Sequence, residues 1–576
     1  MRPLILVALL IALPLASFAQ RAEPEAATAA PGQPPKPLAR AERQMIVTAN
    51  PHATEAGLAM LRAGGSAVDA TIAALLVLNV VEPQSSGLGG GAFALVHGAE
   101  GLESWDARET APLSATDALF LEDGAPMPWS VAQTTGRAIG VPGLAPLLER
   151  LHARHGRLPW DTLFEPAIRL AAEGFAVSPR LAALVARAPE LFDATARAVF
   201  LPDGRPIAAG ETLRQPVLAA TLEAIAQTGA AAVTSPGPIR AAILAVVRAE
   251  PSPGALTAGD FDAYRVIERV PVCHGYRAAW RVCGMGPPSS GATTVGQILT
   301  LVGGAPPAED PGDPALWHRF AEASKLAYAD RARYLGDPDQ VAVPVAGLLD
   351  PGYLEARGAL IDDSRAMASP AAAGTPPGAT DLAPATSDTS PGTTHVSAID
   401  ADGLAVAVTA SIESAFGTGR MAAGLLLNNQ LTDFSFVPRG EDGRPIANAP
   451  GPGKRPRSSM APTIVYARGS AVPSVVLGSP GGSRIPEYVA GALIGMLDLG
   501  LDPAEAAALF HVSQRNREDT VLETGAAPEE LGAALVGLGH AVATFEMTSG
   551  LGILRRGPAG LEGGADPRRE GVAAGD

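Results

Sequence analysis

The chain has 576 residues, of which 47% are hydrophobic, and its formal net charge is −16 at pH 7. This composition is typical of a soluble globular protein with a large core, and the length alone predicts roughly two to four domains. The acidic charge and the lack of any basic run exclude a nucleic-acid-binding surface. An anionic substrate would therefore have to meet individually placed cations.

The first residues have the pattern of a secretory signal. Arg2 precedes an apolar run over residues 4–15, and a small-x-small cleavage site ends at Ala19. The run is shorter than the about 20 residues that a membrane span needs, so an uncleaved anchor is the weaker alternative. We expect residues 1–19 to be removed, residues 20–42 to form a flexible leader, and the protein to be periplasmic or secreted, with no membrane span.

Helical patterns alternate with short apolar strands after the leader. Residues 52–63 carry apolar side chains at helical spacing and stop at Gly64. Residues 67–81 form an apolar run that is too short for a membrane span and predicts a buried helix. Residues 140–248 are rich in helical patterns, and residues 321–334 predict another helix.

Only two cysteines occur, Cys273 and Cys283, and the spacing suits two strands joined by a turn. In an exported protein such a pair is a candidate disulfide, and two buried thiols are the alternative. No cysteine–histidine cluster surrounds them. His152 and His155 share a helix face, but nothing near them in the sequence completes a ligand set. We therefore predict no metal site.

The pattern changes abruptly at Thr393. Residues 366–392 are rich in Ser, Thr, Pro, Ala and Gly and predict a linker. The next segment is apolar or alternating on both sides of Asp402-Gly403, which is typical of a β-hairpin. Thr393 would therefore open a buried strand, and the remaining chain is strand-rich with helices over residues 486–499 and 504–508.

A threonine at this place is a candidate nucleophile. A hydroxyl is a weak nucleophile near neutral pH and needs an adjacent base. Cutting the Gly392–Thr393 bond would free the α-amine of Thr393, whose reference pKa of about 7.7–8.0 suits that task. A plain turn or strand threonine is the alternative interpretation.

Motifs spread over most of the chain occur in the order typical of one enzyme family. They are ATEAG from Ala53, GGSAVDA from Gly64, VVEPQSSGLGGGAF from Val80, DARETAP from Asp106, GVPG from Gly140, KLAYADRARYLGDP from Lys325, LLNNQLTDF from Leu426, KRPRSSMAPT from Lys454 and GSPGGSR from Gly478. With the Thr393 segment, these motifs make the chain resemble the γ-glutamyltranspeptidase family of the N-terminal-nucleophile hydrolase class.

The resemblance implies an α+β fold, an αββα sandwich made as a precursor. It implies cleavage between Gly392 and Thr393 into a large subunit, residues 43–392, and a small catalytic subunit, residues 393–576. The two subunits would form one interlocked domain, which replaces the several domains that length alone predicts.

The resemblance also assigns roles to residues of the motifs. Thr393 is the nucleophile of self-cleavage and of catalysis, and Ser411 stands where the family usually has a second threonine. Gly481 and Gly482 follow an apolar strand and precede a helix, where backbone N–H groups form an anion site. The family uses such a glycine pair as an oxyanion hole.

The substrate's amino-acid head has its own set of matching residues. A guanidinium suits bidentate capture of a carboxylate, and Arg108 matches the family arginine that holds the α-carboxylate. Ser458 and Ser459 match the serine pair on the same group. Asp433 matches the acidic partner of the α-ammonium, and Gln430 the glutamine near that amine.

Two features depart from the family pattern. Glu413 stands where the best-known members have asparagine, and a carboxylate beside Asp433 would attract an ammonium more strongly or protonate through like-charge repulsion. It could instead mark a different acyl group. The stretch between Phe434 and Lys454 is short and lacks the family's lid tyrosine. A more open pocket would change the ratio of transfer to hydrolysis.

We therefore expect an exported γ-glutamyltransferase or glutathione hydrolase that needs no cofactor and passes the acyl group to water or an acceptor amine. Three alternatives remain: a glutaryl-type (cephalosporin) acylase of the same superfamily, a non-catalytic exported binding protein that stays uncut, and an enzyme acting on polyglutamate capsules.

Overall fold

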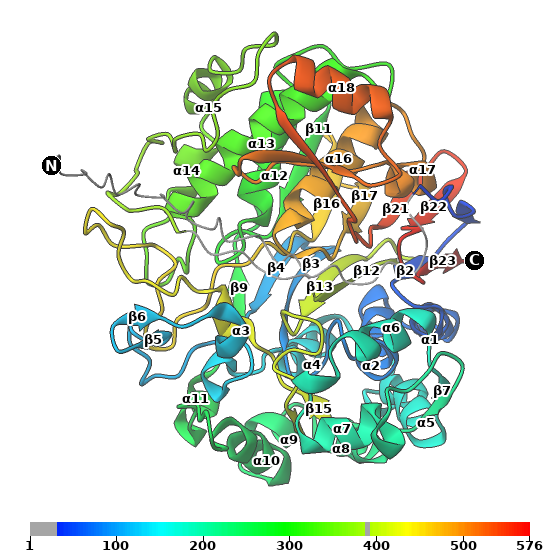
Figure 1. Ribbon diagram of the computed structural model, residues 1–576. Coiled ribbons are helices and arrows are strands. Elements are labelled where there is room, and N and C mark those ends of the chain that lie inside the picture. Colours follow the sequence, from blue (N-terminus) through cyan, green and yellow to red (C-terminus); the bar gives the residue numbers. More distant parts are fainter. Residues whose placement is uncertain (1–31, 386–391) are drawn as a thin grey trace, which may run out of the picture.

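The computed structural model describes residues 32–385 and 392–576. The expected signal, residues 1–19, and the first part of the leader lie outside the described residues. Two seven-stranded sheets form the centre of the molecule (Figure 1), and every pair of neighbouring strands in them is antiparallel.

Each sheet combines strands from both sides of the Gly392–Thr393 junction. In spatial order the first sheet consists of β23 (Val572–Gly575), β2 (Met45–Thr48), β12 (Thr393–Ile399), β13 (Ala405–Ser411), β3 (Gly91–Gly98), β4 (Gly101–Ala107) and β9 (Ile267–Arg269). The second consists of β1 (Ala39–Ala41), β22 (Gly560–Ala565), β21 (Gly552–Gly557), β17 (Pro473–Gly478), β16 (Thr463–Ala467), β11 (Trp280–Gly284) and β10 (Val272–Tyr276).

Helices cover the outer face of each sheet. The first sheet packs against α1 (Pro51–Arg62), α2 (Ala67–Val81) and α4 (Leu144–His155). The second packs against α12 (Gly291–Val302), α16 (Ile485–Leu497) and α17 (Pro503–Ala508). Figure 1 shows the resulting four layers, with helices above and below the two sheets. The fold is therefore α+β, an αββα sandwich of the N-terminal-nucleophile hydrolase type.

Other helices extend the two outer layers. On the side of the first sheet they are α5 (Glu165–Glu173), α6 (Pro179–Arg187), α7 (Ala194–Phe200), α8 (Pro216–Thr228), α9 (Ala231–Thr234), α10 (Pro238–Val247) and α11 (Ala258–Ala263). On the side of the second sheet are α13 (Pro314–Tyr334), α14 (Val345–Leu348), α15 (Pro351–Gly358) and α18 (Glu529–Gly537), with a small sheet of β18 (Val512–Ser513), β19 (Asp519–Glu523) and β20 (Ala541–Phe545). Within the described residues, we find no helix that is both long and apolar enough to cross a membrane.

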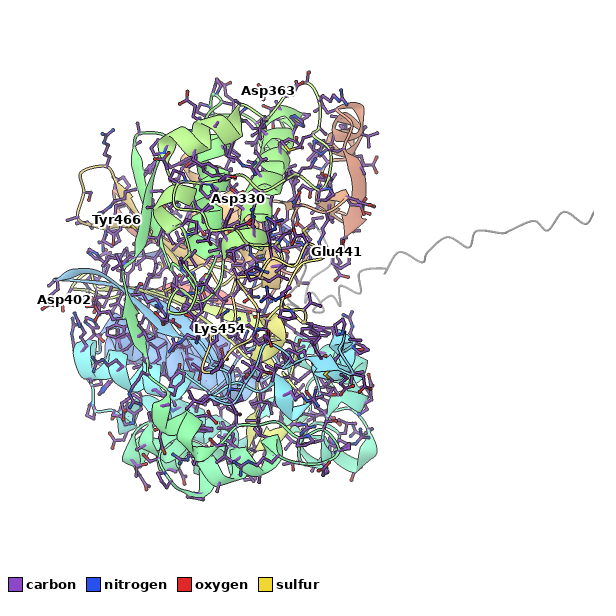
Figure 2. The ribbon with its side chains drawn as sticks, turned by 90° about the vertical axis from the view of Figure 1, so that its left-hand side faces the viewer. Asp330, Asp363, Asp402, Glu441, Lys454 and Tyr466 are labelled. Atoms are coloured by element: carbon purple, nitrogen blue, oxygen red, sulfur yellow. A yellow bond between two sulfur atoms is a disulfide. The ribbon has the colours of Figure 1, made fainter. Side chains whose placement is uncertain are left out.

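The hairpin of β12 and β13 lies at the centre of the first sheet, as the sequence predicts. Every residue of both strands is buried, because the second sheet covers one face and α2 the other. The Asp400 carboxylate accepts N–H bonds from Asp402 and Leu404, both at 3.0 Å, and Gly403 takes the φ of +88° that the turn requires. Figure 2 shows Asp402 at the outer edge of the molecule. Thr393, at the other end of the hairpin, is buried.

The buried helix α2 follows the predicted bounds, residues 67–81, and a capping box fixes its start. Ser66 Oγ accepts the Asp69 N–H at 3.1 Å, and the Asp69 carboxylate accepts the Ser66 N–H at 2.9 Å. All fifteen residues of α2 are buried. The apolar run therefore forms an inner helix, packed between the first sheet and α4 and α5.

Cys273 and Cys283 lie opposite each other in β10 and β11 and form a disulfide. These two strands form the edge of the second sheet. The bridge therefore closes a hairpin and is remote from the start of β12.

Three segments differ from the sequence-based expectation. The leader over residues 20–42 is not flexible at its end: residues 39–41 form β1, and Lys36 Nζ donates to the Arg569 carbonyl at 2.6 Å. Helix α13 begins seven residues before the predicted residue 321, because the Asp313 side chain caps its first turn.

The predicted linker over residues 366–392 is also attached to the rest of the protein along its described part. Ala366 N–H donates to the Leu538 carbonyl and Ala385 N–H to the Ala332 carbonyl, both at 2.7 Å. Such scattered main-chain bonds leave no periodic pattern in a sequence, so composition alone indicated a loose chain.

Candidate active site

A small pocket lies at the start of β12. It collects nearly all of the predicted site residues from distant parts of the chain. Its lining consists of Arg108, Thr393, Ser411, Glu413, Gln430, Asp433, Ser458, Ser459, Met460, Gly482 and Ile485. Gly481 adjoins the lining through Gly482. Met460 and Ile485 are apolar neighbours that the sequence did not single out.

Thr393 stands directly opposite Ser411 in the register of β12 and β13. Thr393 Oγ1 donates to Ser411 Oγ at 3.3 Å, and Ser411 Oγ donates to the Gly392 carbonyl oxygen at 2.7 Å. The Glu413 N–H donates to Ser411 Oγ at 2.8 Å and fixes that hydroxyl. A chain of hydrogen bonds therefore connects the Thr393 hydroxyl with the carbonyl that precedes it.

Gly392 lies against the backbone that follows β13. A Cβ atom at this position would stand 2.0 Å from the Glu413 carbonyl oxygen and 2.5 Å from the Ser414 carbonyl carbon. Any side chain would therefore push the bond between Gly392 and Thr393 away from Ser411. The glycine is required by this close approach.

The turn after β17 carries the glycine pair. Gly481 has a φ of +134° and Gly482 a φ of +58°, both in the region that favours glycine. A Cβ on Gly481 would also stand 2.4 Å from the Tyr488 ring. Within the described residues we find no acceptor for the amide N–H of either glycine. Two backbone donors thus stand at the edge of the pocket, at the start of a short helical turn that continues into α16.

Arg108 is completely buried and lines the pocket. Its guanidinium donates to the Pro456 carbonyl at 3.1 Å and the Arg457 carbonyl at 3.0 Å, and it is paired with the Asp433 carboxylate. The remaining nitrogen, Nη1, has no hydrogen-bond partner among the described residues. Arg108 is therefore held rigidly, and the two N–H groups of Nη1 remain available to a ligand.

Two oxygen atoms of the pocket complement this donor. Gln430 Nε2 donates to Asp433 Oδ2 at 3.2 Å, whereas Gln430 Oε1 and Asp433 Oδ1 accept no hydrogen bond from any described residue. Buried polar atoms are normally satisfied, so each of these atoms indicates a missing partner. A cationic donor with two acceptors fits a ligand head that carries both a carboxylate and an ammonium.

The serine pair connects the pocket to α13. Ser459 Oγ accepts from Arg331 Nη2 at 2.6 Å, and Ser458 Oγ accepts the Met460 N–H at 3.2 Å. Arg331 also donates to Ser290 Oγ at 2.8 Å. Arg331 lies within the KLAYADRARYLGDP motif, but its approach to Ser459 joins positions 128 residues apart and leaves no local signal.

Glu109 is a second residue that sequence reasoning missed. Its carboxyl is fully buried, lies 3.9 Å from Arg108 Nη1, and has no hydrogen-bond partner among the residues described. Burial raises the pKa of Glu109 to about 8, although the Arg108 charge opposes the shift. In the sequence, Glu109 could have been found from its position directly after Arg108 in the DARETAP motif.

Glu413 takes a φ of +78°, which is unusual for a residue other than glycine or asparagine. Its carboxylate accepts from Asn429 Nδ2 at 2.6 Å and from the Ser414 hydroxyl. Glu413 therefore lines the pocket, and Asn429 and Ser414 hold its carboxylate through hydrogen bonds.

His395 belongs to the packing between the sheets. Its ring nitrogens lie 2.9 Å from Thr409 Oγ1 and 2.9 Å from Ser397 Oγ, and burial lowers its pKa to about 3. A Cβ on Gly478 would stand 2.3 Å from this ring. His395 is thus a neutral, enclosed side chain two residues after Thr393.

The αββα sandwich with a threonine at the start of a central strand defines the N-terminal-nucleophile hydrolase class. Within this class, a family model described as "Gamma-glutamyltranspeptidase" matches residues 53–576. The chain belongs to the gamma-glutamyltranspeptidase family.

Individual relatives agree with this placement. The chain is 37% identical to the glutathione hydrolase proenzyme of Escherichia coli over 547 residues, covering 92% of this chain and 91% of that protein. It is 34% identical to the glutathione hydrolase proenzyme of Bacillus subtilis over 522 residues, covering 88% and 86%. Among solved structures, the cephalosporin acylase from Bacillus halodurans is similar, with a TM-score of 0.83 and 28% identity over 95% of this chain and 98% of that one.

Proposed function

We propose that this protein is a self-processing γ-glutamyltransferase and glutathione hydrolase. It cleaves γ-glutamyl amides through a threonyl ester and passes the γ-glutamyl group to water or to the amine of an amino acid or peptide. The observation that carries the proposal is a set of three buried atoms without a hydrogen-bond partner among the described residues: Arg108 Nη1, Asp433 Oδ1 and Gln430 Oε1. Together they suit the α-carboxylate and α-ammonium of a glutamyl group.

Self-cleavage follows from the hydrogen-bond chain at the junction. The Thr393 hydroxyl oxygen attacks the Gly392 carbonyl carbon, while Ser411 donates to the carbonyl oxygen on which negative charge develops. The C–N bond then breaks, the Thr393 nitrogen takes up the proton that the hydroxyl has lost, and an ester joins Gly392 to Thr393 Oγ1. Water hydrolyses this ester and leaves the large subunit ending at Gly392.

The same hydroxyl acts on substrate once its amine is exposed. The α-amine of Thr393 accepts the hydroxyl proton as the oxygen attacks the γ-amide carbonyl. The N–H groups of Gly481 and Gly482 stabilise the tetrahedral oxyanion, a contribution of about 3–4 kcal/mol for one such donor. The leaving amine takes the proton, and the acyl-enzyme is released by water or by an acceptor amine.

The leaving group occupies a second, larger cavity of about 530 Å³. Arg331 connects the two spaces, because it lines the larger cavity and donates to Ser459 of the smaller one. Arginines dominate the polar lining of this cavity: Arg331, Arg333, Arg444, Arg457, Arg515 and Arg517. In a chain with a net charge of −16, this concentration favours leaving groups and acceptors that carry carboxylates.

We assign the protein to an exported compartment, periplasmic or secreted. The signal-like residues 1–19 and the disulfide between Cys273 and Cys283 support this assignment.

A glutaryl-type acylase remains the second candidate, favoured by Glu413 and by the similarity to the cephalosporin acylase structure. The two functions differ in their need for an α-amine on the acyl group. We expect processed protein to cleave γ-glutamyl anilide faster than glutaryl anilide, because only the first satisfies Asp433 and Gln430. Glu413→Asn should change the ratio of the two rates. Equal or faster cleavage of the glutaryl compound by the unmodified protein would reject the γ-glutamyl assignment.

A further inference from the structure

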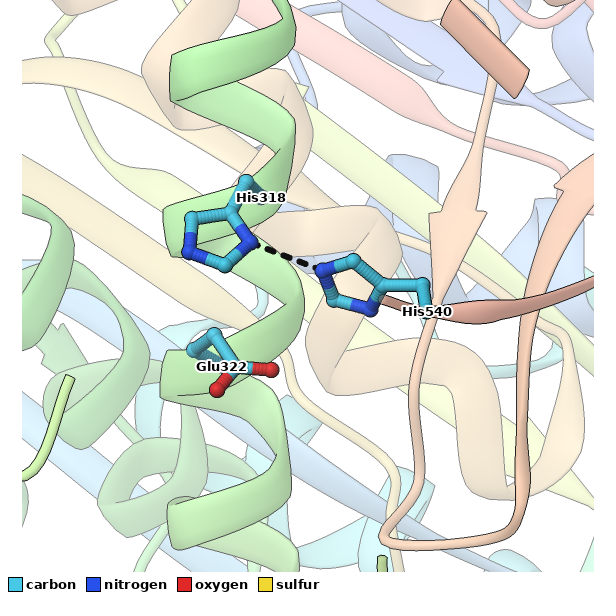
Figure 3. Close-up of side chains that lie close together, drawn as sticks. All are labelled: His318, Glu322 and His540. Carbon is cyan, nitrogen blue, oxygen red and sulfur yellow. Dashed lines mark hydrogen bonds between the residues drawn. The ribbon is translucent and has the colours of Figure 1, made fainter. Parts of the chain in front are cut away.

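Two histidines and a glutamate meet in a buried cluster far from the pocket at Thr393. His318 and Glu322 lie one turn apart on α13, and His540 directly precedes β20 (Figure 3). One ligand atom from each side chain lies within 4.8 Å of the other two, and all three residues are buried. The facing atoms of the histidines, His318 Nδ1 and His540 Nε2, are 2.8 Å apart.

The outer hydrogen bonds of both rings suit metal ligands. His318 Nε2 lies 2.9 Å from the Asp362 carbonyl oxygen, which can only accept, so Nε2 carries the proton and Nδ1 presents its lone pair inward. In the metal-free protein, His540 Nε2 therefore donates to His318 Nδ1. His540 Nδ1 lies 2.9 Å from Thr520 Oγ1, a hydroxyl that can also accept, so the ring proton can move to Nδ1 when Nε2 binds a metal ion. Metal-binding histidines usually have such an acceptor behind the ligating nitrogen.

The charged groups at the cluster are the Glu322 carboxylate and the Lys325 ammonium. The Glu322 carboxylate is held by the Met367 N–H at 2.7 Å and by Lys325 Nζ at 2.8 Å. Lys325 balances the negative charge of Glu322 when no metal ion is bound. A metal ion would therefore compete with Lys325 for the Glu322 carboxylate.

We propose that His318, Glu322 and His540 form a binding site for Zn²⁺ that connects the two halves of the chain. Two imidazoles and one carboxylate are a ligand set that Zn²⁺ accepts, with water as the fourth ligand. The facing nitrogens must open from hydrogen-bond contact to the wider spacing of two ligands on one ion. His318 and Glu322 precede Gly392, whereas His540 follows Thr393, so after the proposed cleavage the ion would bridge two polypeptides.

Metal binding is tested first on the uncut full chain, Thr393→Ala, so that the result does not depend on processing or activity. After removal of metal with a chelator, titration with Zn²⁺ should give one bound ion per chain. His540→Gln and Glu322→Gln should weaken binding at least about tenfold, because each removes a ligand. Lys325→Met should tighten binding by about tenfold, because it removes a like charge.

His52→Gln is the matched control, because His52 is an exposed histidine on α1. It should bind Zn²⁺ as the parent protein does. Tetrahedral Co²⁺ absorption in the parent and its loss in His540→Gln would provide an independent readout, and circular dichroism would verify that the variants are folded. If the parent and His540→Gln bound Zn²⁺ equally, His540 would not be a ligand. The two histidines would then form only a hydrogen-bonded pair, and the proposal would be overturned.

The bridge between the halves is tested on processed protein and rests on the proposed cleavage. The urea concentration at which the two polypeptides separate should be higher with Zn²⁺ than with chelator. The difference should disappear in His540→Gln. An unchanged midpoint, alongside one bound ion per chain, would reject the bridge and leave the metal site.

Discussion

Ser411 contacts both reacting groups of the self-cleavage step. Its hydroxyl accepts from Thr393 and donates to the carbonyl of Gly392. We expect Ser411→Ala to slow cleavage by about 10²-fold, the usual effect of removing one donor from a developing oxyanion. Ser411→Thr keeps the hydroxyl and should retain cleavage.

Cleavage is measured as the appearance of two bands on a denaturing gel over time. Thr393→Ala gives the reference for no cleavage, since it lacks the attacking hydroxyl. Cleavage of Ser411→Ala at the parental rate would contradict the role given to this residue.

Arg108 is best tested by a substitution that keeps its charge. Arg108→Ala would leave the buried Asp433 carboxylate without its partner and so unfold the site as well. Arg108→Lys keeps a positive charge but loses the planar pair of donors. We expect KM for the γ-glutamyl donor to rise by about 10- to 100-fold with a smaller change in kcat. An unchanged KM would exclude Arg108 from carboxylate binding.

Glu109 predicts a pH dependence of stability. Its pKa is about 8 in the folded protein against 4.5 for an exposed glutamate. Between these pH values the folded protein binds the extra proton, so the free energy of unfolding falls as the pH rises. In Glu109→Gln this contribution is absent, and the fall between about pH 5 and 8 should be shallower.

Urea unfolding across that pH range measures the effect. Glu100→Gln is the control, because the Glu100 side chain is 81% exposed. Parallel slopes for the parent protein and Glu109→Gln would exclude a protonated Glu109.

At the scale of elements, the hairpin of β10 and β11 carries the disulfide at the edge of the second sheet. Closing so short a loop stabilises a protein by about 2–3 kcal/mol. Cys283→Ser paired with Cys273→Ser should therefore lower the free energy of unfolding by up to that amount and leave kcat/KM unchanged. Calorimetry and a standard donor assay check both parts. A loss of activity in the folded variant would indicate that the hairpin supports the pocket.

Elements with a local signal could be predicted from the sequence. The Asp402-Gly403 turn indicated the central hairpin, and the apolar run over residues 67–81 gave the bounds of α2. The three residues of β1 were missed because a strand this short has no alternation, and its partner β22 lies more than 500 residues away.

The site was predictable only where a family motif covers it. Thr393, Arg108 and Asp433 stand within contiguous motifs, so their common pocket could be inferred without coordinates. The contact of Arg331 with Ser459 depends on how α13 packs, and no spacing in the sequence encodes it. The cluster of His318, Glu322 and His540 was likewise missed, because one of its members is 222 residues from the first.

At the scale of the whole molecule, the arginine-lined cavity predicts a preference set by charge. The double variant Arg333→Gln/Arg517→Gln should lower kcat/KM roughly three- to tenfold for a γ-glutamyl peptide that carries carboxylates, and the loss should shrink at high salt. A neutral γ-glutamyl anilide should be cleaved as before. Arg319→Gln, a change at an arginine paired with Asp363 outside this cavity, is the control. Equal losses for both substrates would show that the arginines support the fold and do not select the leaving group.

Both sheets combine strands from either side of the junction before Thr393. After scission, neither polypeptide could be withdrawn without dismantling the whole sandwich. Dissociation of the two polypeptides should therefore not depend on protein concentration. Dilution would not release free polypeptides, and two differently tagged batches would form no hybrids on mixing. Each molecule would keep for its lifetime the partner with which it was synthesised.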